Sequence, residues 1–447
     1  MTRVPADPTA RLLRSRTVVT PDGQRPAAVR VRDGRIAQVL DIDAPAQPDE
    51  TTEDLGDLAL LPGLVDTHVH LNEPGRADWE GFAAGTAAAA AGGVTTLIDM
   101  PLNCEPVTTD AEALSRKRIA AEGKLAVDVG FYGGLVAGNA AAMPGLIEAG
   151  VVGVKAFLCD SGIDTFPPAT EDDLRAAMPV LAEAGLPLLV HAELTRDNVP
   201  AMRNPRGYFD YLATRPPSFE RDAVDMMIRL CEDTGCRTHV VHLADAGCLD
   251  PIKDAKDRGL PLTVETCPHY LAFAAEDIPE GFTLAKCAPP IRDETNRRTL
   301  WDALVKGVID LVASDHSPCP PKLKSLDAGR FDKAWGGISS LQLGLGVVWK
   351  MAHEAEKTLS DVVNWMGAAP ARLVGLEHRH GIVPRRPAHL VAFDPEAVWA
   401  PFPDELRSRH PVTPYLGMAM RGRVVRTYVH GTPIDDDTTR PGELIRR

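Results

Sequence analysis

The sequence predicts a (β/α)8 barrel of the TIM type joined to a small β domain. From about residue 62 to 376, short apolar runs alternate with longer segments of helical spacing, and eight of those runs qualify as strands. Strands that alternate with helices form a parallel sheet with right-handed crossovers, and eight such units close into a barrel. Most of the runs are continuously apolar, as strands that are covered on both faces require.

The predicted barrel strands are, in chain order, 64–70, 95–101, 126–135, 152–158, 187–193, 238–244, 261–270 and 310–318. Helical spacing is clear between them, for example over 170–184 and 222–234. The Ala-rich stretch 83–98 contains three glycines and follows Glu80. It therefore predicts a buried helix that runs into a strand, and not a membrane span.

The two ends of the chain differ from the middle. Segments 16–20, 28–31 and 36–40 read as hairpin strands separated by turns, and segments 390–393 and 424–429 have the same character. We therefore expect one small β domain that is discontinuous in sequence. Residues 1–61 form its N-terminal part, residues 62–376 the barrel, and residues 377–447 its C-terminal part and a tail.

Composition narrows the class of protein. A net charge of −14 argues against a nucleic-acid partner, which favours a basic face. The eight cysteines include no CxxC pair, which predicts free thiols in a reducing compartment. We see no basic and apolar leader typical of secretion. The expectation is a cytoplasmic protein that acts on a small molecule, with no membrane partner.

The most informative motif is His68-Val69-His70, which ends the first barrel strand. Residues i and i+2 of a strand point to the same face, so the two imidazoles form half of a metal site. The alternative is two unrelated histidines, one buried and one exposed. Four later strands also carry ligand types near their ends, namely Lys155, His191, His242 and Asp315. Active sites of such barrels lie at the C-terminal ends of the strands, and this favours a metal centre.

Lys155 stands between Val154 and Ala156 in an apolar strand. A buried lysine must lose its charge or find a partner. A neutral amine can take up carbon dioxide and become a carbamate, which has two oxygens and can bridge two cations. A lysine that reaches solvent or pairs with a carboxylate is the alternative. The other five candidate ligands favour the N6-carboxylated lysine between two divalent ions. His68, His70 and Asp315 would complete one ion's shell, and His191 and His242 would hold the other.

The remaining histidines receive lesser roles. His239 lies three residues before His242 and therefore faces away from it, so we expect a structural role. His316 points away from Asp315, and His269 is a candidate neighbour of the site. The histidines of the C-terminal part are expected to be solvated, and these are His378, His380, His389, His410 and His430.

The sequence resembles the cyclic amidohydrolases, the family of dihydroorotases, hydantoinases and allantoinases. The resemblance covers residues 10–430 and is closest to the allantoinases. The segments that carry it are 66–76, 79–82, 99–103, 155–159, 162–164, 286–292 and 313–319. It implies a binuclear site with a carboxylated lysine, and the hydrolysis of allantoin to allantoate in purine catabolism. Zinc is the expected metal, with manganese or cobalt as alternatives. A homotetramer is also implied.

Two positions test the choice of subfamily. Dihydroorotases usually carry an arginine where this chain has Asn72, and hydantoinases a tyrosine where it has Asp160. An uncharged amide suits a neutral ring with a ureido arm. The alternative functions are a hydantoinase or dihydropyrimidinase and, as a minor one, a non-catalytic metal-binding homologue.

The expected mechanism uses a hydroxide that bridges the two ions, which lower the pKa of water. Asp315 would take the hydroxide's proton and pass it to the departing ring nitrogen. The substrate is expected to be oriented by Asn72, Asn103, Ser161 and Gly337.

Overall fold

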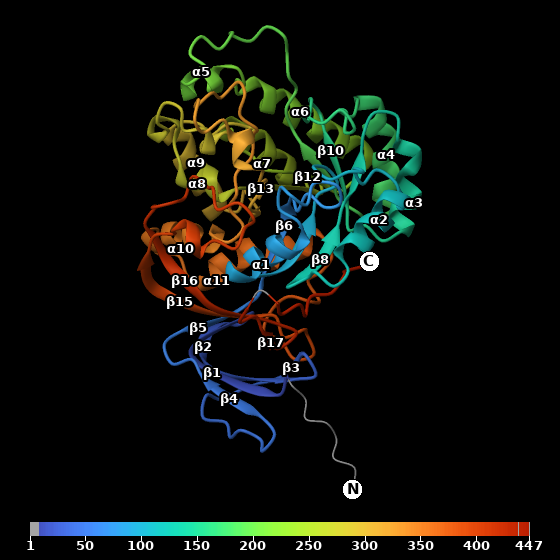
Figure 1. Cartoon of the computed structure of the whole chain (residues 1–447). Coiled ribbons are helices and arrows are strands. Elements are labelled where there is room, and N and C mark those ends of the chain that lie inside the picture. The colour runs from blue at the N-terminus through green and yellow to red at the C-terminus, as the bar shows by residue number, and fades with distance from the viewer. Residues whose placement is uncertain (1–8, 437, 447) are drawn as a thin grey trace.

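The protein, seen in a computed structural model that describes residues 9–436 and 438–446, consists of a parallel barrel above a mixed, mainly antiparallel sheet (Figure 1). Both predicted parts of the fold are confirmed. The exact domain boundaries at residues 61 and 376 stay a prediction.

The barrel is formed by short, almost fully buried strands. Their bounds are β6 (Leu64–Val69), β7 (Val94–Asp99), β8 (Asp128–Phe131), β9 (Gly133–Leu135), β10 (Val154–Phe157), β11 (Leu188–His191), β12 (Thr238–Val240), β13 (Leu262–Thr266) and β14 (Leu311–Val312). Neighbouring strands pair in parallel from β9 to β14 and from β6 to β8. The predicted third strand is interrupted at Tyr132 and contributes both β8 and β9.

The first and last barrel strands meet just beyond β14. Val69 and His316 form a parallel bridge, and the N–H of His70 donates to the carbonyl of His316 at 2.8 Å. This closure brings the end of β6 next to the segment that follows β14. The His68–His70 motif and Asp315 therefore become neighbours although they lie far apart in the sequence.

Helices surround the barrel (Figure 1). The predicted helix 170–184 is α4 (Glu171–Ala184), which begins at a capping box formed by Thr170 and Asp173. The predicted helix 222–234 is the longer α6 (Ser218–Thr234). The Ala-rich stretch gives α1 (Phe82–Ala91) and then β7, as expected. The other α-helices are α2 (Ala111–Ala121), α3 (Met143–Glu148), α5 (Tyr208–Ala213), α7 (Leu249–Asp257), α8 (Pro268–Ala272), α9 (Glu294–Val305), α10 (Gly344–Glu354), α11 (Leu359–Val363) and α12 (Ala369–Leu373).

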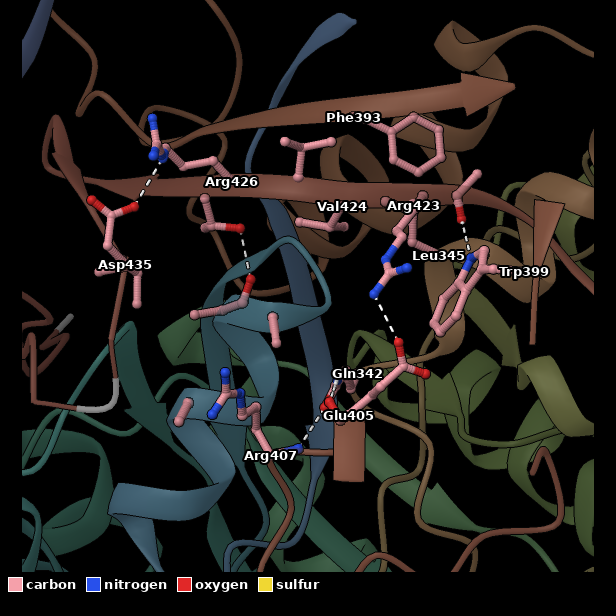
Figure 2. A pocket seen from close by; sticks show the side chains of 18 of the residues that line it. Gln342, Leu345, Phe393, Trp399, Glu405, Arg407, Arg423, Val424, Arg426 and Asp435 are labelled. Atoms are coloured by element: carbon pink, nitrogen blue, oxygen red, sulfur yellow. Dashed lines mark hydrogen bonds and ion pairs between the residues drawn. The ribbon is translucent and has the colours of Figure 1, made fainter. Parts of the chain in front are cut away.

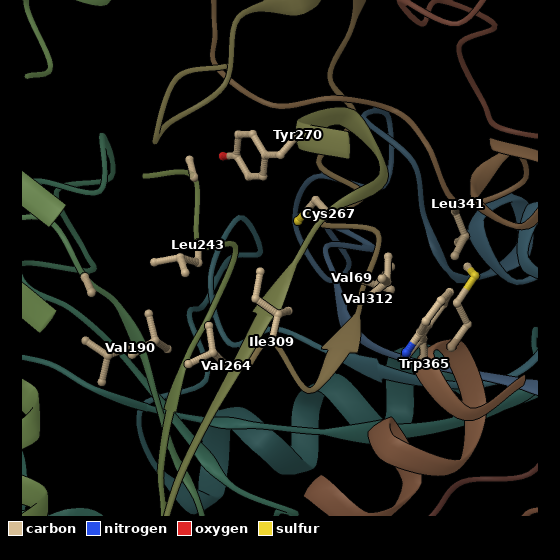
Figure 3. Packing of buried hydrophobic residues seen from close by; sticks show 14 of the residues in the cluster. Val69, Val190, Leu243, Val264, Cys267, Tyr270, Ile309, Val312, Leu341 and Trp365 are labelled. Atoms are coloured by element: carbon tan, nitrogen blue, oxygen red, sulfur yellow. The ribbon is translucent and has the colours of Figure 1, made fainter. Parts of the chain in front are cut away.

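One large apolar core joins the barrel strands to these helices. Val190, Val264 and Val312 come from three different strands and pack toward side chains from the surrounding segments, such as Trp365 (Figure 3). Removal of this much apolar surface from water is the main favourable contribution to folding. It also holds the strand ends, and hence the site, in fixed positions.

The second sheet, which is mainly antiparallel, is assembled from both ends of the chain. Its strands are β1 (Arg11–Thr20), β2 (Gly23–Arg32), β3 (Arg35–Leu40), β4 (Thr51–Asp54), β5 (Ala59–Pro62), β15 (Leu390–Trp399), β16 (Met420–Val429) and β17 (Thr432–Pro433). The order is β17-β16-β15-β5-β1-β2-β3, with β4 beside β1, and the pairing is antiparallel except that β1 pairs in parallel with β4 and β5. The antiparallel pair of β5 and β15 joins the N-terminal to the C-terminal strands.

Two of the histidines expected to be solvated are buried. His380 is 8% exposed and His389 is 5% exposed, so the expectation was wrong for both. His389 lies directly before β15, where the terminal sheet meets the barrel, and its Nε2 lies 3.2 Å from a carboxylate oxygen of Asp128. No helix within residues 9–436 and 438–446 is long and apolar enough to cross a membrane.

Candidate metal centre and active site

Five of the six predicted ligands lie at or just beyond the C-terminal ends of barrel strands, and the sixth, Lys155, lies inside its strand. His68 lies in β6 and His70 directly after it, Lys155 lies in β10, and His191 ends β11. His242 follows β12 by two residues and Asp315 follows β14 by three. All six are buried. We call these six residues, His68, His70, Lys155, His191, His242 and Asp315, the catalytic cluster.

One half of the catalytic cluster is formed by His68, His70 and Asp315. A ligand atom from each lies within 4.8 Å of the others. Nε2 of His68 lies 3.2 Å and Nε2 of His70 lies 3.6 Å from Oδ1 of Asp315. Burial raises the pKa of Asp315, but the neighbouring histidines outweigh burial and hold it well below its usual range. Burial lowers the pKa of His70. An anionic carboxylate beside neutral imidazoles is the form that binds a cation.

The other half is formed by His191 and His242. Nδ1 of His191 lies 2.9 Å from Nε2 of His242, and Nε2 of His191 lies 2.9 Å from the carboxylate of Glu193. Because the carboxylate accepts the Nε2 proton, the lone pair of His191 lies on Nδ1, which faces His242. Burial lowers the pKa of both histidines. Two imidazole nitrogens thus converge on one point.

Lys155 lies near Asp315, His191 and His242 and has no hydrogen-bond partner within the described residues. Its side chain is fully buried, and its Nζ makes no hydrogen bond within the described part of the chain. Burial lowers the pKa of Lys155 to about 7. An unpaired buried amine is costly, and the cost falls when it becomes neutral and binds something. The donor set therefore fits the carbamate, with which Lys155 would reach ions on both sides.

The buried carboxylate of Glu265 contacts two histidines, one of which is the predicted ligand His68. Oε1 of Glu265 lies 2.5 Å from Nδ1 of His68, and its Oε2 lies 3.0 Å from Nε2 of His239. Burial raises the pKa of Glu265, but His68 and His239 outweigh it and hold it at about 2. The carboxylate fixes the ring of His68, as carboxylates behind metal-binding histidines do. His239 has the structural role expected of it, through this same glutamate.

The backbone at two ligands is strained. His242 has a φ of 39° and Asp315 a φ of 44°, a region that residues other than glycine rarely adopt. Such conformations persist only where surrounding contacts impose them, and they gather at functional sites. Here they turn two side chains into the space above the strand ends.

A cavity of about 350 Å³ opens above the catalytic cluster. Three of the four predicted substrate-binding residues line it, namely Asn103, Ser161 and Gly337. Asn72 does not lie among the lining residues. It is 1% exposed, its Nδ2 donates to the carbonyl of Pro318 at 3.3 Å, and its Oδ1 has no partner within the described residues.

The lining residues are held by short-range contacts. The amide of Asn103 lies 3.1 Å from Nδ1 of His70. Ser161 Oγ donates to the carbonyl of Phe166 at 2.7 Å, so it can only accept from a bound molecule. Gly337 has a φ of 124°, and a Cβ there would lie 2.6 Å from Ser317, so this close approach requires glycine.

Sequence reasoning missed three charged residues at the cavity. Arg215 and Lys286 line it, and the buried Glu193 lies directly behind its wall, against His191 and Arg215. Arg215 lies in the connection between α5 and α6, where no periodic pattern marks a site. Glu193 stood two residues after a predicted ligand, a spacing that places both side chains on the same strand face and that could have signalled it.

A second hollow, of about 320 Å³, lies on the outer wall between β16 and the neighbouring helices (Figure 2). Its charged side chains are largely paired with one another. Arg423 contacts Glu405 at 2.8 Å, and Arg426 contacts Asp435 at 2.9 Å (Figure 2). The catalytic cluster, in contrast, contains an unpartnered lysine nitrogen. The chemistry-bearing cavity is therefore the one at the strand ends.

Comparison with known proteins shows which family the chain resembles and over how much of its length. A model of the amidohydrolase family matches residues 59–434. An allantoinase from Arabidopsis thaliana is 45% identical over 436 residues, which covers 93% of this chain and 86% of that protein. An allantoinase from Streptomyces avermitilis is 45% identical over 441 residues and covers 98% of both. The solved structure of L-hydantoinase (dihydropyrimidinase) from Arthrobacter aurescens has a TM-score of 0.91 at 27% identity, and covers 98% of this chain and 100% of that one.

Proposed function

We propose that this chain, which belongs to the amidohydrolase family and within it to the allantoinases, hydrolyses the ring amide of allantoin to give allantoate. The observation that carries the proposal is the convergence of four histidines and Asp315 on one cavity, together with the nearby amine of Lys155, which is buried and makes no hydrogen bond to any described residue. The family and the ligand clusters together imply a binuclear centre of divalent ions.

The two ions would be held as follows. His68, His70 and Asp315 would bind one, His191 and His242 the other, and a carboxylated Lys155 would contact both. Zinc suits these ligands, and manganese and cobalt are alternatives. When bound, the ions supply acidity to water and polarise a carbonyl. A homotetramer and a cytoplasmic location complete the proposal.

Asp315 is proposed as the group that moves the proton. Its carboxylate lines the cavity and is anionic, and Ser317 Oγ donates to its Oδ1 at 3.0 Å. It would accept a proton from the attacking water and deliver it to the ring nitrogen that leaves. This transfer is needed because an amide nitrogen is a poor leaving group until it is protonated.

The choice of allantoin depends on two positions that distinguish the subfamilies. Asn72 stands where a dihydroorotase would have an arginine, and Asp160 where a hydantoinase would have a tyrosine. The carboxylate of Asp160 accepts from the N–H of Gly162 at 2.9 Å and so shapes the loop beside the cavity. Asn103, Ser161 and Gly337, which line the cavity, are proposed to orient the ring and its ureido arm, whereas Asn72 lies outside the lining and was expected in this role wrongly.

The test is kcat/KM for allantoin, hydantoin, dihydrouracil and dihydroorotate with metal-replete enzyme. We expect allantoin to react fastest, because hydantoin lacks the ureido arm and dihydroorotate would bury a carboxylate. If dihydrouracil or a 5-substituted hydantoin exceeds allantoin by about tenfold, about 1.4 kcal/mol in the barrier, the protein is a hydantoinase.

A further inference from the structure

A chain of buried polar contacts leads from the cavity wall to one half of the catalytic cluster. Arg215 Nε donates to Oε1 of Glu193 at 3.1 Å, and its Nη2 contacts Oε2 of the same carboxylate. Glu193 Oε2 in turn accepts from His191 at 2.9 Å. The side chain of Glu193 is 0% exposed, whereas that of Arg215 is 22% exposed and lines the cavity.

Arg215, which lines the cavity, keeps donor capacity beyond its contacts with Glu193. Its Nη1 makes no hydrogen bond to any of the described residues, and it is not among their buried unpartnered atoms. The fork that binds Glu193 fixes the guanidinium plane, so little conformational freedom remains to be lost on binding. Arg215 is also held at its backbone, where its carbonyl accepts from Arg292 at 3.4 Å.

The other cation at the cavity is committed elsewhere. Lys286 Nζ donates to the carbonyls of Phe331 and Ala334, and it therefore holds the loop that carries Gly337. The N–H of Gly337 is itself engaged with the carbonyl of Lys286 at 2.8 Å. Of the two cations that line the cavity, Arg215 is therefore the one with a guanidinium nitrogen, Nη1, that makes no hydrogen bond to the described residues.

The inference rests on the proposed function. In allantoin the ureido arm is attached to the ring carbon next to the carbonyl that is attacked. A carbonyl held at the catalytic cluster therefore places the arm within a few bonds of the metal ligands. The arm's own carbonyl oxygen is a strong acceptor, and guanidinium N–H groups are matched donors.

We propose that Arg215 binds the ureido oxygen of allantoin and thereby determines specificity, while Glu193 is a positioning residue that fixes Arg215 and His191 relative to each other. The carboxylate of Glu193 then holds both Arg215, which binds the arm, and His191, a predicted metal ligand. The pair of Arg215 and Glu193 is neutral overall, so it supplies hydrogen bonds to a neutral arm without creating a net positive site that would reward a carboxylate-bearing ring.

The first test is Arg215→Met, which keeps the apolar stem and removes the donors. We expect kcat/KM for allantoin to fall by about 10- to 100-fold, the range for loss of a hydrogen bond to a charged group. Hydantoin, which has no arm, should change by less than about threefold. Because this variant leaves Glu193 without its cation, the double variant Arg215→Met/Glu193→Gln removes the buried charge as well and should show the same change in substrate ratio.

The matched control is Arg221→Met. Arg221 follows Arg215 closely and also contacts a buried carboxylate, Asp245, at 2.6 Å, but it does not line the cavity. The Arg221→Met variant should leave kcat/KM for allantoin and for hydantoin unchanged. Two further readouts do not depend on turnover. Metal per chain, measured by inductively coupled plasma mass spectrometry, should be unchanged in Arg215→Met. The affinity of the holoenzyme for allantoate, measured by calorimetry, should fall by about tenfold or more.

The outcomes separate the two proposals. A wild-type enzyme that does not hydrolyse allantoin overturns the proposed function. A wild-type enzyme that does, with Arg215 variants that lose allantoin and hydantoin rates equally, overturns the specificity role of Arg215. Loss of metal in Arg215→Met with an unchanged substrate ratio also overturns it, because Arg215 would then act on the metal ligand alone.

Discussion

Two clusters of histidine and acidic residues lie at opposite ends of the barrel strands. The catalytic cluster lies at the C-terminal ends. The other, which we call the basal cluster, consists of Asp128 at the start of β8 together with Arg379, His389 and His430. In each cluster, atoms of two histidines and one aspartate lie within 4.8 Å of one another. Residue types alone would assign a metal to both.

In the basal cluster the carboxylate of Asp128 is fully partnered, although Nε of Arg379 and Nε2 of His389 make no hydrogen bond within the described residues. The carboxylate of Asp128 is contacted by Arg379 at 2.7 Å, by His430 at 2.9 Å and by His389 at 3.2 Å. It also accepts from the N–H of Glu443 at 2.9 Å. The arginine cancels the one negative charge, so the cluster gains nothing from a further cation. It joins the barrel to the terminal sheet.

In the catalytic cluster, some buried polar groups lack a partner among the described residues. Arginines do not contact Asp315 within residues 9–436 and 438–446, and Lys155 has no hydrogen bond there. Polar groups left unpaired in a buried site are rare and need an explanation. The comparison teaches that a metal site is recognised by what its ligands lack, and not by their identity.

The largest expected effect comes from Lys155→Ala. Removal of the shared ligand should abolish most activity, by at least about a thousandfold, the upper range for the loss of preorganised electrostatic stabilisation. At least one metal per chain should also be lost. Kinetics and metal analysis test this, and short-chain carboxylic acids should restore part of the activity by replacing the carbamate.

Lys117→Ala is the matched control, since Lys117 is equally buried but contacts Asp99 at 2.5 Å. It should lower stability and leave the metal content per folded chain unchanged. The prediction fails if metal-loaded wild-type protein is found to contain an unmodified Lys155 amine.

Asp315→Asn should have a smaller effect. The amide keeps the shape of the side chain but cannot accept a proton, so turnover should fall by about a hundredfold or more, the usual range for lost acid–base catalysis. Circular dichroism should show an unchanged fold, and much of the metal should remain. Turnover near that of the wild type would assign the proton transfer to another group, and His269, which is buried nearby, would be the next candidate.

Asp128→Asn should affect stability and leave chemistry intact. Loss of the buried charge leaves Arg379 uncompensated, which should lower the free energy of unfolding by about 3 to 5 kcal/mol. Urea denaturation measures this, and kcat per folded molecule should match that of the wild type. If the variant instead loses a metal ion, the basal cluster is a metal site and the comparison above is wrong.

The pH dependence of the free energy of unfolding gives a finer check on the role of Asp128. Burial raises the pKa of Asp128, but His389 and His430 outweigh burial and hold it well below its usual range. A carboxyl whose folded pKa is depressed contributes its full stability above its unfolded pKa, about 3.9, and loses that stability progressively as the pH falls from there through the folded pKa. The gap in unfolding free energy between wild type and Asp128→Asn should therefore narrow below about pH 4. A gap that widens there would contradict this assignment.

Much of the fold and site followed from local patterns. Apolar runs of four to eight residues that end in ligand types are visible in the sequence, so His68, Lys155 and Asp315 could be placed at strand ends. The barrel topology then brings such ends together without further information.

The remainder depended on contacts that the sequence does not display. Arg215 reaches the cavity from an irregular connection, where no periodicity predicts a direction. His389 was expected in solvent because its partner Asp128 lies on another domain and resembles any acidic residue at the start of a strand. Asn72 has a left-handed backbone, and this turns it toward Pro318 instead of the cavity.

The terminal sheet has a consequence for synthesis on the ribosome. Arg35 contacts the carbonyl of Arg385, which lies 350 positions later in the sequence. One edge of β5 stays unpaired until β15 has been synthesised. The early strands therefore emerge long before their partners and expose unpaired edges in the meantime. Non-local pairing of this kind slows folding and invites association between nascent chains. The same arrangement that ties both ends of the finished protein together therefore leaves its N-terminal strands unprotected until the last part of the chain has been made.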